Sequence, residues 1–323
     1  MVHGKPIGRA PKNKPCCHTF AALLIAVLLP IVVMAGEPDA SLRGKLAWQI
    51  ALERAAFSPG LIDGRPGAKT ELATREFQRV RGLPITGLPD EATAAALKIQ
   101  PATAITTYKV QRGDLDGIGP APKDWVARSK LKRLGYVSLG DALAEKFHCT
   151  RGLLVALNPG RDIDGLQPGD MLSAPAVEEK LPAPRGERIE INLSEKVIRV
   201  LDGRGQLVGL FHCSIAADRA RAPSGDARVS VVAEDPEYTF DPKMWPEVKG
   251  VDHKLTIPPG PRNPVGACWI GLSLPGYGIH GTPTPEMIGK TGSHGCFRLT
   301  NWDALRLSRM IQVGTPVRFV GDR

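Results

Sequence analysis

The sequence predicts a multidomain protein in which a small three-helix bundle and an α+β module precede a mainly β domain. Between residues 40 and 100, apolar residues recur at the spacing of amphipathic helices. Between residues 101 and 180, the pattern indicates a strand, two helices and a second strand. After a short linker with prolines and a glycine at residues 182–186, apolar and polar residues alternate as in half-buried strands. We therefore expect domains at residues 36–100, 101–180 and 185–321, and we expect a fragment starting near residue 185 to fold by itself.

The N-terminal segment, residues 1–35, has the composition of an export signal. Basic residues without acids are followed by an uncharged run at residues 19–35, and Ala35 before Gly36 is an acceptable cleavage context. The run is at the short limit for a membrane span, and Pro30 would disturb a continuous helix. The segment is expected to be either a cleaved signal peptide or a membrane anchor, so a membrane is a partner only if the segment is retained. Both readings place the protein in the periplasm or cell envelope.

The composition of the 323-residue chain, 42% hydrophobic and 23% charged, is that of a globular protein. Its net charge is +9, and four basic residues before residue 19 supply part of that charge. The remaining basic residues form no dense block, and only 5% of residues are aromatic. These features exclude an aromatic stacking platform for single strands, and we expect no nucleic-acid partner.

The predicted helical domain, residues 36–100, has apolar faces that include Leu46 and Ile50 on one helix, and Ala73 and Phe77 on another. Three stretches resemble the peptidoglycan-binding domain found on cell-wall enzymes: LIDGRPGAKT at residues 61–70, EFQ at 76–78 and GLPITG at 82–87. The resemblance implies that peptidoglycan is a partner. A helical spacer without a ligand is the alternative.

The second region, residues 101–180, resembles a LysM module, a glycan-binding fold, most clearly over residues 136–177. The resemblance rests on the order strand, helix, helix and strand, with Asn158 and Pro159 ending the second helix. A charged insertion at residues 123–133 departs from the short opening of such a module. We therefore describe the region as LysM-like with an insertion.

The segments IHGT at residues 279–282 and SHGCFRL at residues 293–299 contain the groups of a thiol acyl-transfer site. A thiol becomes a good nucleophile as a thiolate, and imidazole is its usual activator, so Cys296 and His280 are the candidate pair. Glycines beside them allow backbone N–H groups to approach a developing oxyanion. A zinc site from His280, His294 and Cys296 is the alternative, but the paired spacing of zinc motifs is missing. We expect neither a metal nor a cofactor.

With LTIPPGPRNPVG at residues 255–266 and the run from GLS to PGYG at residues 271–278, these segments resemble the catalytic domain of YkuD-type L,D-transpeptidases, bacterial cell-wall cysteine enzymes. The resemblance covers roughly residues 187–321 and implies a mainly β, β-sandwich-like fold. It implies that Cys296 is the nucleophile, that His280 is its base and that the Gly281 carbonyl orients the imidazole. The implied site residues are catalytic Cys296, His280, Gly281, His294 and Gly295, and substrate-binding Ser293 and Arg298.

Two of these roles stay open at the level of sequence. His294 either takes part in the chemistry or holds the loop by local hydrogen bonds. Arg298 either binds a substrate carboxylate or forms a surface salt bridge.

The resemblance implies that peptidoglycan, through its stem peptides and glycan, is the substrate. Cys296 would attack a stem tetrapeptide, D-alanine would leave, and an amine would accept the acyl group. The acceptor would be a second stem peptide, giving a cross-link, or an amine of an outer-membrane lipoprotein. With water as the acceptor, the same site would be an L,D-carboxypeptidase. A catalytically inactive peptidoglycan-binding protein and a thiol endopeptidase of unrelated specificity are the other hypotheses.

Four cysteines follow the N-terminal segment, and thiols tend to pair in an oxidising compartment. One arrangement has a Cys213–Cys268 bridge, a buried Cys149 and a reduced Cys296. The sequence leaves the connectivity open.

Overall fold

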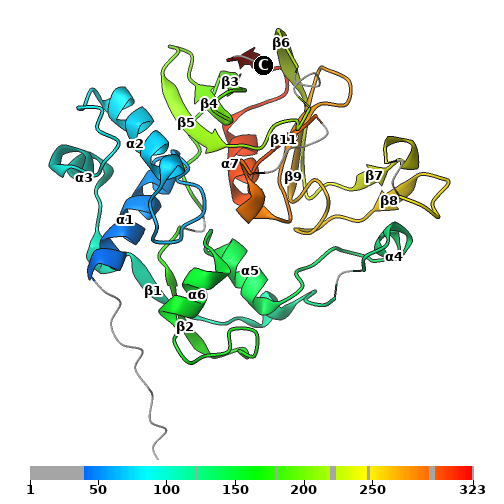
Figure 1. The fold of residues 1–323 in the computed structure, drawn as a ribbon, viewed down its shortest axis with the longest axis horizontal. Coiled ribbons are helices and arrows are strands. Elements are labelled where there is room, and N and C mark those ends of the chain that lie inside the picture. The colour runs from blue at the N-terminus through cyan, green and yellow to red at the C-terminus, as the bar shows by residue number, and fades with distance from the viewer. Residues whose placement is uncertain are drawn as a thin grey trace, which may run out of the picture. The chain divides into compact units, whose positions relative to one another are not determined.

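The computed structural model describes residues 40–120, 122–178, 180–218, 223–245, 248–290 and 295–321 (Figure 1). Within these ranges, no helix is both long enough and apolar enough to cross a membrane. The expected export segment at residues 1–35 lies outside the described residues and stays a prediction.

The helical domain contains α1 (Ala40–Arg54), α2 (Ala68–Arg81) and α3 (Glu91–Leu97). Helix α2 ends where Gly82 adopts a left-handed φ of 63° and directs its N–H at the carbonyl of Arg79. Helix α3 begins at Asp90, whose side chain accepts a hydrogen bond from the N–H of Thr93 at 2.9 Å. The three predicted helices are confirmed.

The second region pairs two strands antiparallel around two helices that lie between them in the chain. Its elements are β1 (Ile105–Lys109), α5 (Leu139–Lys146), α6 (Arg151–Leu157) and β2 (Met171–Pro175). The charged insertion contains a further short helix, α4 (Trp125–Ser129), which packs against a strand of the C-terminal domain. The predicted order of strands and helices is present, and the resemblance to a LysM module stays a prediction.

The C-terminal domain is mainly β and is built on an eight-stranded sheet in the order β11-β10-β9-β6-β12-β3-β4-β5. The strands are β3 (Arg188–Asn192), β4 (Val197–Leu201), β5 (Leu207–His212), β6 (Asp226–Glu234), β9 (Cys268–Leu272), β10 (Gly278–His280), β11 (Phe297–Arg298) and β12 (Pro316–Val320). A separate hairpin pairs β7 (Tyr238–Phe240) with β8 (Leu255–Ile257). Short 3₁₀ helices are η1 (Pro101–Thr103), η2 (Arg112–Leu115), η4 (Pro242–Met244) and η5 (Pro285–Met287).

Strand β6 joins the two halves of this sheet. Its first residues pair with β12, its later residues pair with β9, and the register shifts between Val229 and Val231. At the two edges of the sheet, Ser214 after β5 and Arg298 on β11 exchange backbone hydrogen bonds of 2.9 and 3.0 Å. The expected β-sandwich-like arrangement is therefore a single sheet that curls until its edges meet.

Helix α7 (Asn301–Met310) packs against β9 and β10 and covers the sheet behind the strands that carry the candidate site. Its N-cap is Thr300, whose hydroxyl accepts the N–H of Asp303 at 3.2 Å. Leu307 and Met310 pack into the apolar core together with strand residues such as Ile270 and Phe297.

The helical domain and the C-terminal sheet share a core. The N–H of Ser58 donates to the carbonyl of Leu210 on edge strand β5, and the N–H of Leu210 donates to the carbonyl of Ala56, both at 2.8 Å. Phe57 and Leu210 lie in one buried apolar cluster with Trp48 of α1. A fragment starting near residue 185 would expose this surface, which argues against independent folding and makes the fragment a test of this contact.

Candidate active site

Strand register places the candidate base and Arg298 on one face of the sheet, next to the candidate nucleophile. Strands β10 and β11 are parallel, and His280 is paired with Arg298. Cys296 comes directly before β11 and lines the same cavity as Arg298. Trp269 of β9 is the antiparallel partner of His280 and shares that face. The fold thus brings together a thiol, an imidazole, a guanidinium and an indole.

His280 is held in one tautomer. Its Nδ1 lies 2.6 Å from the Gly281 carbonyl oxygen, which only accepts, so Nδ1 carries the proton and Nε2 has the lone pair. Burial lowers the pKa of His280 to about 4, and the nearby Arg298 charge acts in the same direction. The imidazole is therefore neutral at neutral pH and able to accept a proton.

The thiol of Cys296 is partly buried, and its Sγ lies 3.5 Å from the Gly276 carbonyl oxygen. Burial raises the pKa of Cys296, whereas a backbone hydrogen bond from Gly278 and the charge of Arg298 oppose that shift. The thiol is thus protonated at rest and needs a base during attack.

Cys296 opens onto a cavity of about 280 Å³. The cavity is lined by Tyr238, Met244, Trp245, Pro264, Val265, Trp269, Gly276, Gly295, Cys296 and Arg298. A second hollow of about 480 Å³ shares Tyr238, Val265 and Trp269 and continues toward Ala233 and Glu237. An elongated ligand with a reactive carbonyl at Cys296 could extend along both.

Trp269 forms the floor between the two hollows and the buried imidazole. Its ring stacks on His280 with centroids 5.8 Å apart. A Cβ at Gly278 would lie 2.4 Å from the same ring, so only glycine fits at this position of β10. His280 itself is only 5% exposed. The indole therefore shields the base from solvent on the cavity side.

The structure places Gly281 against His280 and Gly295 in the cavity wall beside Cys296, as described above. Ser293 and His294 lie outside the described residues, so their roles stay predictions. Among the described residues, no group of three or more His, Cys, Asp or Glu side chains is arranged to hold a metal ion.

None of the four cysteines within the described residues forms a disulfide. Cys213 follows β5 and Cys268 opens β9, and these strands are not neighbours in the sheet. Burial raises the pKa of Cys213 to about 12 and that of Cys268 to about 11, so both are unreactive core thiols. The Cys213–Cys268 bridge considered from the sequence is not formed.

Several residues that shape the site have no motif around them. Trp269 and Tyr238 line the cavity, and Asn301 packs against the backbone of Gly281. A tryptophan or tyrosine in a β-rich segment is most simply read as a core residue, so composition did not single them out.

Comparison with known proteins gives two family matches. A model described as the L,D-transpeptidase catalytic domain (YkuD) matches residues 186–319. A model for a domain provisionally described as peptidoglycan binding matches residues 46–97.

Two relatives carry the same family name as the first match. A provisionally named L,D-transpeptidase, YqjB, of Bacillus subtilis is 32% identical over 148 residues, which cover 44% of this chain and 75% of that protein. A provisionally named L,D-transpeptidase, YkuD, of Bacillus licheniformis is 28% identical over 177 residues, or 55% of this chain and 90% of that protein. The crystal structure of a mutant L,D-transpeptidase of Enterococcus faecium matches at 18% identity with a TM-score of 0.31, over 42% of this chain and half (50%) of that chain.

Proposed function

The chain belongs to the L,D-transpeptidase family, and from this premise we propose that it is a cysteine-dependent acyltransferase acting on peptidoglycan stem peptides. The observation that carries the proposal is that Cys296 and Arg298 line one cavity, while the buried His280 is the strand partner of Arg298 and stacks on Trp269 in the cavity wall. We further propose that it acts outside the cytoplasm, in the periplasm or cell envelope, where its substrate lies.

In the first half-reaction, Cys296 attacks the amide that joins the third residue of a stem tetrapeptide, at its L-configured centre, to the terminal D-alanine. Nε2 of His280 takes the thiol proton as the carbon–sulfur bond forms. Backbone N–H groups of Gly295 and Cys296 stabilise the oxyanion. The amide bond then breaks, His280 returns the proton to the departing D-alanine amine, and a thioester remains on Cys296.

In the second half-reaction, an acceptor amine attacks the thioester and His280 removes its proton. The new amide forms, the carbon–sulfur bond breaks and Cys296 recovers its proton. A second stem peptide gives a cross-link, and an outer-membrane lipoprotein amine gives attachment of that protein to the wall. Water as acceptor gives a carboxypeptidase. Shielding of His280 by Trp269 favours an amine that binds in the cavity over bulk water.

We assign substrate selection to residues around Cys296 and His280. Arg298, half-buried beside Cys296, would bind a carboxylate of the donor, and Ser293 would contact the same peptide. His294 would shape the loop before Cys296. The helical domain would bind wall polymer and raise the local substrate concentration.

The test is intact-protein mass spectrometry after incubation with a carbapenem and, separately, with a stem tetrapeptide. Wild type should gain one adduct and release D-alanine, whereas Cys296→Ala should gain none at an unchanged melting temperature. Cys149, Cys213 and Cys268 remain in that variant and control for non-specific thiol modification. An adduct of equal yield in Cys296→Ala would remove the nucleophile from the proposal.

A pair of variants separates the histidines. His280→Ala should lower the acylation rate by about 10²- to 10⁴-fold, the usual contribution of a general base. His294→Ala should cost less, because its proposed role is in loop geometry. The opposite order, at equal folding and substrate affinity, would exchange the two roles.

A further inference from the structure

We propose that Glu145 is a positioning residue for His280, which it orients through Asn301 although it lies outside the catalytic domain. Glu145 belongs to α5 in the LysM-like region, whereas the catalytic-domain match begins at residue 186. The proposal rests on the proposed function, in which His280 is the base.

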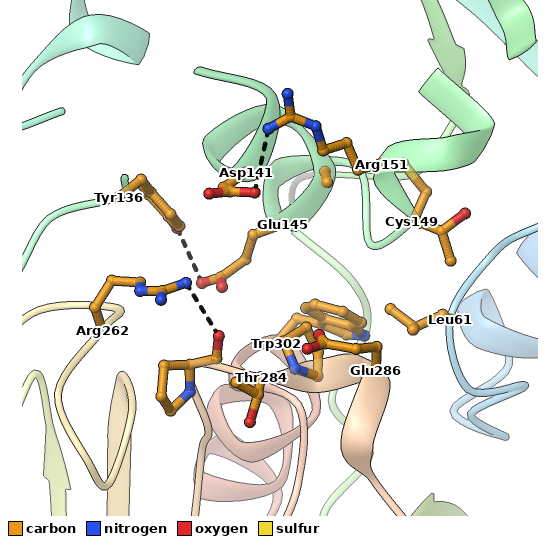
Figure 2. Close-up of a pocket in the computed structure, with 14 residues that line it drawn as sticks. Leu61, Tyr136, Asp141, Glu145, Cys149, Arg151, Arg262, Thr284, Glu286 and Trp302 are labelled. Carbon is orange, nitrogen blue, oxygen red and sulfur yellow. Dashed lines mark hydrogen bonds and ion pairs between the residues drawn. The ribbon is translucent and has the colours of Figure 1, made fainter. Parts of the chain in front are cut away.

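Glu145 holds the side-chain amide of Asn301 with both carboxylate oxygens. Asn301 Nδ2 lies 2.9 Å from Oε1 and 3.1 Å from Oε2. The Tyr136 hydroxyl donates to Oε1 at 2.9 Å, as Figure 2 shows. Burial raises the pKa of Glu145, and the hydrogen bonds from Asn301 and Tyr136 oppose that shift. Nδ2 of Asn301 also donates to the Pro261 carbonyl at 3.2 Å, so the two carboxylate oxygens and this carbonyl together fix which end of the Asn301 amide faces α5.

Asn301 transmits that orientation to the loops beside the base. With Nδ2 toward Glu145, its Oδ1 accepts the N–H of Ala267 at 3.0 Å. The side chain is buried, and a Cβ at Gly281 would lie 2.2 Å from Oδ1, so the amide packs directly on that backbone. The Gly281 carbonyl in turn holds Nδ1 of His280. A rotated Asn301 amide would disturb the group that sets the tautomer and direction of the imidazole.

A second hydrogen bond, made by Arg262, also holds the loop after His280. Arg262 donates to the Pro283 carbonyl at 3.3 Å, across a cavity of about 340 Å³ that Glu145, Thr284 and Trp302 help to line (Figure 2). Because Glu145 lines this cavity, water can fill the space that is left when its side chain is truncated, and no void forms in an apolar core. The expected loss is one of orientation, with the fold preserved.

The first experiment compares Glu145→Ala with Asp141→Ala. Asp141 is on the same helix, lines the same cavity and pairs with Arg151 at 3.5 Å, so it is a matched loss of charge without a contact to Asn301. Glu145→Ala should lower kcat for acylation about 10-fold with KM within about 2-fold, because a displaced catalytic group costs up to about 10²-fold in rate. Asp141→Ala should stay within about 2-fold of wild type. Glu145→Gln, which offers one acceptor oxygen in place of two, should lie between.

A double variant tests the direction of the hydrogen bond. Asn301→Asp places a carboxylate against the carboxylate of Glu145 and should lose at least as much rate as Glu145→Ala. Adding Glu145→Gln restores an N–H donor opposite that carboxylate and should recover part of the loss. A purely additive loss would overturn the proposed contact.

NMR titration of the His280 imidazole, assigned with His280→Gln, gives a readout that needs no activity. Burial lowers the pKa of His280 to about 4 and the Gly281 hydrogen bond raises it, so a loosened loop should move that pKa away from its wild-type value in Glu145→Ala and leave it unchanged in Asp141→Ala. If wild type does not acylate but this shift occurs, the proposed function fails and the positioning role stands. If wild type acylates and neither rate nor titration separates Glu145→Ala from Asp141→Ala, the positioning role is wrong.

Discussion

The helical domain and the LysM-like region contact the catalytic domain in different ways. The helical domain meets the edge strand β5 and the buried side of α7 with apolar side chains and buried polar groups. The LysM-like region contacts segments near the candidate active site. Glu145 accepts a hydrogen bond from Asn301, and Trp125 stacks on Phe240 of the β7–β8 hairpin. We therefore expect changes at the first contact to affect mainly stability and changes at the second to affect mainly the geometry of the site.

Buried polar groups make the first contact specific. The Ser58 hydroxyl donates to the Asp303 carboxylate at 2.8 Å. Arg306 donates to the carbonyl oxygens of Glu53, Arg54 and Pro182, so it joins α1, the linker and α7. An arginine whose donors are satisfied by backbone carbonyls would leave several buried groups unpaired if the domains separated.

The largest expected effect is loss of the fold in a fragment starting near residue 185, which lacks the helical domain and therefore the first contact. The fragment exposes Leu210 and the apolar residues around it and leaves Arg306 without its carbonyl partners. It should be recovered in low yield and show no cooperative melting transition by circular dichroism, whereas residues 36–321 should melt cooperatively. A fragment that melts cooperatively and acylates at the wild-type rate would show that the first contact is dispensable.

Phe57→Ala should weaken the same contact without removing it. Phe57 is buried between Leu210 and the edge of Phe77, whose ring centroid is 5.6 Å away. Truncation of a buried phenylalanine costs about 3–5 kcal/mol in the free energy of unfolding. Urea denaturation measures that cost, and Leu88→Ala, at an exposed position of the same domain, is the control. Below the transition, acylation should stay near the wild-type rate, and a large loss of rate at full folding would mean that this contact also shapes the site.

The sequence predicted the elements more successfully than their contacts. The three helices before residue 100 and the strands after the linker follow from local patterns, and the structure confirms them. The contact of Glu145 with Asn301 joins residues 156 positions apart, and that of Ser58 with Asp303 joins residues 245 apart. Each of these side chains is unremarkable in its own segment, so no periodicity or motif marks it.

The expectation that the domain after the linker folds by itself rests on the same kind of local signal. Proline and glycine at residues 182–186 report local backbone preferences, and they carry no information on whether the flanking surfaces pack. Similarly, the motif at residues 279–282 predicted His280 as the base, but the residue that supports its loop comes from another region of the chain.

Asp303→Asn should change how stability depends on pH at the first contact. Burial raises the pKa of Asp303 to about 6, and the charge of Glu53 acts in the same direction, while His148 and hydrogen bonds from Ser58 and Thr300 oppose it. A raised folded-state pKa favours the protonated form, so the contribution of Asp303 to stability is present below about pH 4 and is lost as pH rises toward about 6.

The measurement is the difference in melting temperature between wild type and Asp303→Asn at pH values from about 4 to 7. Because the variant cannot titrate at this position, the difference isolates Asp303 from its charged neighbours. Across pH 4–6, the melting temperature of wild type should fall relative to that of the variant, which corresponds to a loss of at most about 3 kcal/mol in the free energy of unfolding. Above about pH 6 the difference in melting temperature should be constant. A difference that does not vary with pH would mean that Asp303 titrates normally in the folded protein.

The smallest expected effect concerns Trp125, which tests the second contact at the cavity wall. Trp125 lies in the charged insertion and stacks on Phe240 with ring centroids 4.2 Å apart, and its ring lies 6.2 Å from that of Tyr238. Tyr238 lines both hollows beside Cys296, so loss of the indole should loosen one wall of the donor site. An aromatic pair is worth about 0.5–1.5 kcal/mol, so Trp125→Ala should raise KM for the tetrapeptide roughly 2- to 10-fold with little change in kcat.

Lys130→Ala, an exposed position in the same insertion, is the control and should leave KM unchanged. A fall in kcat at constant KM would instead place the effect of Trp125 on the chemical step, and the insertion would then act in the same way as Glu145.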